Sequence, residues 1–144
     1  EVADLIAELQ ATRNNIWWIK EMAPHDELTA LLTNADLFLC PSIYEPLGIV
    51  NLEAMGCETA VLGSRVGGIP EVVAHNETGR LVEYDAKNVE KFESDFTTQI
   101  EDLMSNPKLL SEMGKAGRVR AEKHFGWDEV AKQTIELYES VLNK

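Results

Sequence analysis

The sequence is poor in cysteine and has no long hydrophobic run. Its two cysteines, Cys40 and Cys57, match neither a CxxC motif nor a zinc-ligand spacing. Both lie in apolar segments, so we expect them to be buried free thiols. Few cysteines and the absence of a signal peptide favour the cytoplasm. No apolar stretch approaches the roughly 20 residues that span a bilayer, so no membrane span is expected.

Basic residues are also scarce. The chain has 13 lysines and arginines against 25 acidic residues, which gives a formal net charge of −12. Such a surface repels a phosphate backbone on average, so nucleic acid is excluded as an expected partner. A small anion remains a candidate ligand, because backbone N–H groups bind phosphate without basic side chains.

Metal-binding and phosphate-loop motifs are missing as well. The three histidines have no partners at ligand spacing, and we expect neither a metal nor a cofactor. Gly-rich loops of the GxGxxG and GxxxxGK types are absent. A complete doubly wound domain usually opens with a strand and such a turn. This chain opens on a helical pattern and without Met, and both features indicate a piece of a longer protein.

The residues that are present alternate between strand and helix patterns. Apolar runs predict strands over 16–19, 36–40, 60–63 and 80–83. Helical spacing predicts helices over 1–10, 26–32 and 47–56, and a short helix led by Pro70. From residue 88 onward the pattern is helical only, with breaks near 107 and 126. This order predicts an α/β fold with a parallel sheet, followed by C-terminal helices. The continuous run at 36–40 is typical of a strand buried on both faces.

The helix start after the second of these strands lacks a usual cap. Pro46 fits a first helical position, and no Ser, Thr, Asp or Asn precedes it. Leu47, Gly48 and Ile49 therefore offer N–H donors to a phosphate or sugar oxygen, with Gly48 allowing close approach. Water or Glu45 capping this end is the alternative.

Two carboxylates and a second glycine turn flank this start. Each of the carboxylates of Glu45 and Glu53 can accept hydrogen bonds from two neighbouring sugar hydroxyls. The alternative is that one of them is only a charge at the helix N-terminus and the other a solvated side chain. Gly67-Gly68, just before Pro70, forms either a second ligand loop or an ordinary left-handed turn.

Taken together, these segments resemble the donor-binding signature of retaining GT-B glycosyltransferases of the group 1 class. The resemblance rests on PSIYEPLGIVNLEAM, VGGIPEVV, TGRLV and the ending KHFGWDEVAKQTIELYESVL. The chain departs from the usual EAMACGTPVV by carrying Glu58 and Ala60, where we expect an altered turn. The variant and the run WIKEMAPHDELTALL are similar to actinobacterial glycogen synthase-like enzymes.

The resemblance implies a fold and a function. Residues 1–144 would be one partial domain, the incomplete C-terminal half of a GT-B enzyme, with a nucleotide-sugar-binding region over about 1–86 and a helical segment over about 87–144. The donor would be ADP-glucose or UDP-glucose, the acceptor an α-glucan or another carbohydrate, and the chemistry glycosyl transfer with retention and without a metal.

The resemblance also implies roles for single residues. Glu45 would lie at the reacting carbon and Glu53 on the ribose. Backbone N–H groups of Leu47, Gly48 and Ile49 would meet the sugar and diphosphate, and Gly67-Gly68 would border the pocket. A phosphate-binding Arg and Lys and the acceptor domain would lie outside the sequence, so the chain alone should not turn over.

Three hypotheses stay open at this point. They are a group 1 transferase that makes an α-glucan, another GT-B enzyme such as an epimerase, a mannosyltransferase or a phosphorylase-like enzyme, and a non-catalytic α/β module. An exposed parallel sheet edge would further favour self-association.

Overall fold

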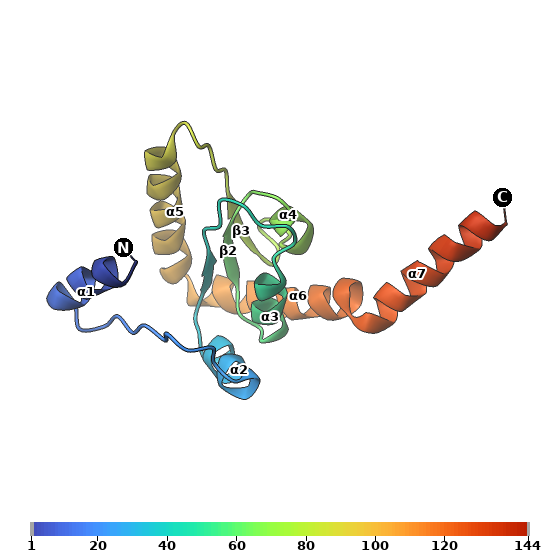
Figure 1. Ribbon diagram of the computed structural model, residues 1–144, viewed down its shortest axis with the longest axis horizontal. Helices are drawn as coiled ribbons and strands as arrows, with labels where there is room; N and C mark the ends of the chain where they lie inside the picture. Colours follow the sequence, from blue (N-terminus) through green and yellow to red (C-terminus); the bar gives the residue numbers. More distant parts are fainter. Residues whose placement is uncertain (1, 144) are drawn as a thin grey trace.

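The computed structural model describes residues 2–143 and is built around a small parallel sheet (Figure 1). The strands are β1 (Phe38–Cys40), β2 (Val61–Ser64) and β3 (Gly79–Val82), in the order β1-β2-β3. Leu62 of β2 is in register with Leu39 on one side and Arg80 on the other. The predicted parallel sheet is therefore confirmed, with three strands close to their expected positions.

Seven helices surround or extend this sheet within residues 2–143. They are α1 (Val2–Thr12), α2 (His25–Thr33), α3 (Ile49–Gly56), α4 (Ile69–Val72), α5 (Val89–Met104), α6 (Pro107–Phe125) and α7 (Trp127–Leu142). Side-chain caps set two of the starts, because Asn88 accepts from the Lys91 N–H and Asn106 from the Leu109 N–H. No helix in this range combines the length and the apolar character required to cross a membrane.

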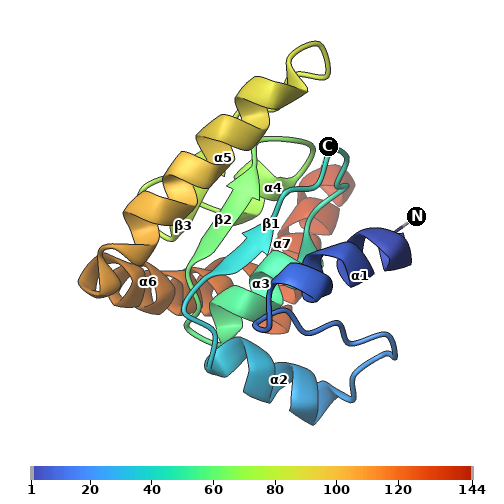
Figure 2. The same ribbon diagram turned by 90° about the vertical axis from the view of Figure 1, so that its left-hand side faces the viewer.

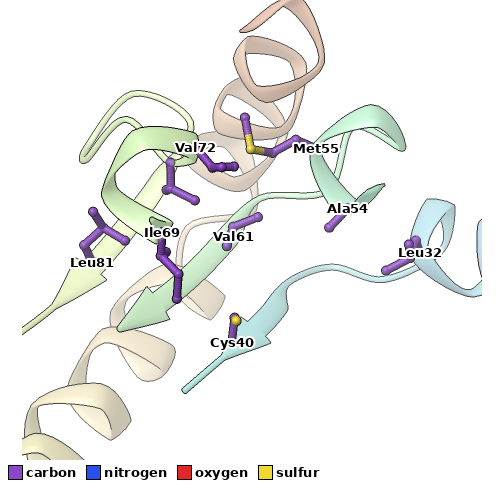
Figure 3. Close-up of a cluster of buried hydrophobic side chains, with 9 residues drawn as sticks. Leu32, Cys40, Ala54, Met55, Val61, Ile69, Val72 and Leu81 are labelled. Atoms are coloured by element: carbon purple, nitrogen blue, oxygen red, sulfur yellow. The ribbon is translucent and has the colours of Figure 1, made fainter. Parts of the chain in front are cut away.

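Strand β2 supplies the core on both faces of the sheet. Val61 points to one face, where it meets Met55 of α3 and Val72 of α4 (Figure 3). Leu62 points to the other face, toward Phe96 of α5 and the start of α6. This alternation follows from the two-residue period of a strand. Figure 2 shows α5 and α3 on opposite sides of the sheet.

The apolar run at 16–19 does not form the predicted strand. Residues 16–20 have no strand assignment, and Trp17 and Trp18 remain 80% and 39% exposed. A strand requires a hydrogen-bonded neighbour, and residues 2–143 provide none for this run.

Burial at the edge strand also differs from the sequence prediction. Leu39 is 43% exposed, because β1 is the edge of the sheet and the helices on that face cover β2 and β3. The expectation that residues 36–40 form a strand buried on both faces was therefore wrong, whereas every residue of β2 is buried. On α2, Leu32 is buried while Leu31 stays half exposed.

Cys40 is a buried free thiol as expected, whereas Cys57 is only partly buried.

Candidate active site

The loop that follows β1 is anchored to the end of the neighbouring strand. Ser64, the last residue of β2, is fully buried and donates its hydroxyl to the carbonyl of Ser42. It also lies 3.5 Å from the carbonyl of Cys40. The carboxyl ends of parallel strands are where α/β sheets bind ligands, and Ser64 fixes the loop there. Sequence reasoning missed Ser64, because a serine at a strand end carries no signal of its own.

Helix α3 begins later than predicted. Its first residue is Ile49, so Pro46 lies in the loop and the assignment of Pro46 to the first helical position was wrong. The N-cap is Gly48, with φ of 89° and ψ of 51°, a left-handed conformation that glycine adopts without strain. The absence of a side-chain cap is confirmed. Of the three predicted donors, only Ile49 belongs to the first turn, and the N–H groups of Leu47 and Gly48 belong to the loop.

The second glycine turn packs directly against this loop. The Gly68 N–H donates to the Glu45 carbonyl at 2.9 Å. A Cβ at Gly67, whose φ is 51°, would lie 1.8 Å from the Glu45 carbonyl oxygen, and one at Gly68 would lie 2.4 Å from that of Pro46. Only glycine permits this approach at both positions. The two turns, which sequence reasoning could only treat separately, therefore form one surface, which we call the glycine platform (residues 45–48 and 67–68).

Both predicted carboxylates are partly exposed. Glu45 is part of the glycine platform, and Glu53 lies on α3. Neither carboxylate takes part in an ion pair within residues 2–143. Each is thus available to accept hydrogen bonds from hydroxyl groups, as a sugar ligand requires.

Asn51, which sequence reasoning missed, lies beneath the same turn. Its side chain is fully buried, and neither amide atom has a hydrogen-bond partner within the described residues. The polar Asn in the mainly apolar stretch IVNLEAM was the available signal.

The turn at Glu58 keeps the backbone shape of a glycine. Glu58 has a φ of 62°, in the left-handed region that non-glycine residues rarely adopt. Helix α6 packs onto this turn at Gly114, where a Cβ would lie 1.9 Å from the Glu58 carbonyl oxygen. In this chain, therefore, a left-handed residue stands where the group 1 pattern has glycine.

A separate hollow of about 520 Å³ lies between β3 and α5, away from the glycine platform. At its rim, Nδ1 of His75 accepts a hydrogen bond from the Leu81 N–H at 3.0 Å. Desolvation by burial lowers the pKa of His75, and the charges of Arg65 and Arg80 lower it further, partly opposed by Glu83. His75 therefore favours its neutral form and caps the edge of β3.

A family model described as "Glycosyl transferases group 1" matches residues 2–120. The chain belongs to this family. Its fold is that of the C-terminal domain of GT-B glycosyltransferases. Sucrose-phosphate synthase from Thermosynechococcus elongatus, 30% identical, matches with a TM-score of 0.78 over 99% of this chain and 34% of that one. Anabaena HepE in complex with UDP, 25% identical, matches with a TM-score of 0.60 over 76% of this chain and 29% of that one.

Among curated relatives, this group 1 glycosyltransferase chain is similar to alpha-maltose-1-phosphate synthase from Mycolicibacterium smegmatis. The two are 46% identical over 98% of this chain and 36% of the relative. The chain therefore spans about a third of the length of these curated relatives.

Proposed function

We propose that the full-length protein transfers a glucosyl residue, with retention, from ADP-glucose or UDP-glucose to a glucose-containing acceptor. The observation that carries this proposal is the glycine platform at the carboxyl ends of β1 and β2, which joins the Glu45 loop to Gly67-Gly68 in a group 1 glycosyltransferase chain. The UDP complex of HepE supports a nucleotide-sugar donor. The name of the maltose-1-phosphate synthase supports a glucosyl group.

Each part of the site has a proposed role. The N–H groups of Leu47, Gly48 and Ile49 bind sugar and diphosphate oxygens, aided by the dipole of α3. Glu53 accepts hydrogen bonds from the two ribose hydroxyls. Gly67 and Gly68 border the pocket.

Glu45 would act on the reacting carbon. When the bond between the anomeric carbon and the diphosphate breaks, the electron pair leaves with the nucleoside diphosphate. Positive charge then develops on the sugar ring, as in glycoside hydrolysis. A carboxylate at Glu45 stabilises that charge, and the N–H donors stabilise the leaving group. An acceptor hydroxyl oxygen then forms the new bond to the anomeric carbon, and its proton passes to the released diphosphate.

Two acceptors follow from different observations. The resemblance to glycogen synthase-like enzymes implies an α-glucan. The name of the mycobacterial relative points instead to α-glucose 1-phosphate, because a glucosyl group joined to that acceptor gives a maltose 1-phosphate.

The test supplies the full-length protein with ADP-, UDP- and GDP-glucose, each with glycogen, with glucose 1-phosphate or with no acceptor, and measures nucleotide release. We expect acceptor-dependent release from one donor and a loss of roughly a hundredfold or more in Glu45→Ala. The exposed loop residue Glu77, changed to Ala, is the matched control and should retain full activity. Release that needs no acceptor would favour an epimerase or a hydrolase. No release and no donor binding would refute the proposal.

A further inference from the structure

Asn51 of α3 is fully buried and unsatisfied. Both Nδ2 and Oδ1 lack hydrogen-bond partners within residues 2–143. Buried side-chain amides are nearly always paired, because leaving one unpaired costs free energy. An unpaired amide beside a candidate active site therefore calls for a partner that arrives or moves during function.

The position of the amide narrows the choice of partner. A Cβ built on Gly48 would lie 2.4 Å from Asn51 Nδ2 and 3.5 Å from Glu45 Cγ. The third atom at this point, Cγ1 of Ile69, also at 3.5 Å, is apolar. The Asn51 amide and the Glu45 side chain thus both border the space that a Gly48 side chain would fill. Because the amide atoms are closed to solvent, a donor sugar cannot reach them in this conformation. Of the two side chains that share this space with the amide, those of Glu45 and Ile69, only Glu45 carries a hydrogen-bond acceptor.

We propose that Asn51 is a positioning residue for Glu45, whose carboxylate rotates to accept a hydrogen bond from Nδ2 when the donor is bound. This inference rests on the proposed function, in which Glu45 acts on the sugar. It gives the buried amide a partner and fixes one orientation of an otherwise unpaired carboxylate. It also gives Gly48 a second role, because any side chain there would separate the two groups.

The test compares Asn51→Leu and Asn51→Ala in the full-length protein. Leu has the same number of side-chain heavy atoms as Asn, and Ala adds no bulk. If one variant does not fold, the other still tests the proposal. We expect kcat to fall roughly tenfold to a hundredfold, the range for a lost hydrogen bond to a charged group. The KM for the donor should change less than about twofold, since the amide does not touch the donor. The unfolding temperature of Asn51→Leu should not fall, because the substitution removes an unpaired polar group.

A double-mutant cycle separates positioning from a structural role. In a Glu45→Ala background, Asn51→Leu should cause no further loss of kcat, because its partner is gone. The control is Asn34→Leu, which removes the 2.8 Å hydrogen bond from Asn34 Nδ2 to the Ala30 carbonyl at the end of α2. It should lower the unfolding temperature and leave kcat unchanged.

The outcomes are distinct. Unchanged kcat in both Asn51 variants, or an equal loss with and without Glu45, would overturn the inference and leave the proposed function intact. If the wild-type protein turns over no nucleotide sugar, both the proposed function and this inference are refuted.

Discussion

Helices α5 and α7 have the same length and the same kind of apolar stripe, but they have opposite environments. Each has 16 residues. Helix α5 buries Phe92, Phe96 and Leu103, whereas α7 buries no residue and leaves Leu142 83% exposed. The difference shows that apolar spacing predicts a helix and which of its faces is apolar. The spacing does not predict which element, if any, packs against that face.

The turns that lead into the two helices account for the difference. The loop before α5 returns the chain to the sheet, where Phe92 packs edge-on against Tyr84 with ring centroids 5.3 Å apart. Before α7, Gly126 is extended, with φ of −64° and ψ of 147°, and α7 leads away from the sheet (Figure 1). Helix α1, at the other end of the described range, likewise has no buried residue.

The largest effect should come from a direct comparison of the two helices. Leu103→Ala on α5 leaves a cavity at a fully buried position, and we expect a loss of roughly 2–5 kcal/mol in the free energy of unfolding. Leu137→Ala on α7, where the side chain is 61% exposed, should change it by less than about 0.5 kcal/mol. Chemical denaturation of the full-length protein measures both. Similar losses would mean that α7 has a partner outside residues 2–143.

A second comparison, between two glycines, tests how tightly α6 packs against the turn at Glu58. Gly114→Ala places a methyl group against the Glu58 carbonyl oxygen, which is backbone and cannot move aside easily. We expect a loss of about 1–3 kcal/mol or more. The matched change Gly56→Ala meets no atom within 4 Å and should be neutral or stabilise α3 by about 0.5–1 kcal/mol. A stable Gly114→Ala protein would show that α6 is not fixed against this turn.

The turn beneath α6 should itself respond to substitution. Glu58→Gly relieves a left-handed non-glycine residue, so we expect a gain of up to about 1 kcal/mol in unfolding free energy. Asn76→Gly is the control, because Asn76 has a similar φ of 65° but asparagine tolerates that region. Thermal unfolding of both variants tests this, and a larger gain at Asn76 than at Glu58 would contradict it.

The smallest effect concerns the exposed edge of β3, where His75 caps the Leu81 N–H. Because the folded-state pKa of His75 is lowered below 6.5, its contribution is present above pH 6.5 and is lost as the pH falls through the folded-state pKa. His75→Gln keeps a hydrogen-bond acceptor and does not titrate. We expect the unfolding midpoint of the wild type to decline relative to that of His75→Gln between pH 7.5 and about pH 5. Parallel pH profiles would show that the imidazole does not cap the strand.

The sequence predicted most elements because local patterns determine them. Strand β2 and the helices α5 and α6 lie close to their predicted positions. For the two helices, the apolar period, the Asn caps and Pro107 all indicate the same boundaries. The strand predicted over 16–19 failed because pairing is a tertiary property. The start of α3 was misplaced because Pro46 fits a loop as well as a first helical turn, and only the contact with Gly67-Gly68 decides between them.

By itself, the sequence determined the α/β order, the group 1 signature and the glycines that the site requires, since these depend on residue type and spacing. Only the tertiary structure decided that the two glycine turns touch through Glu45 and Gly68, and that Ser64 anchors the loop. It alone also showed that Asn51 is buried without a partner next to Glu45. The physical reason is that these contacts join residues distant in the chain, which approach only when the strands pair and the helices pack across them.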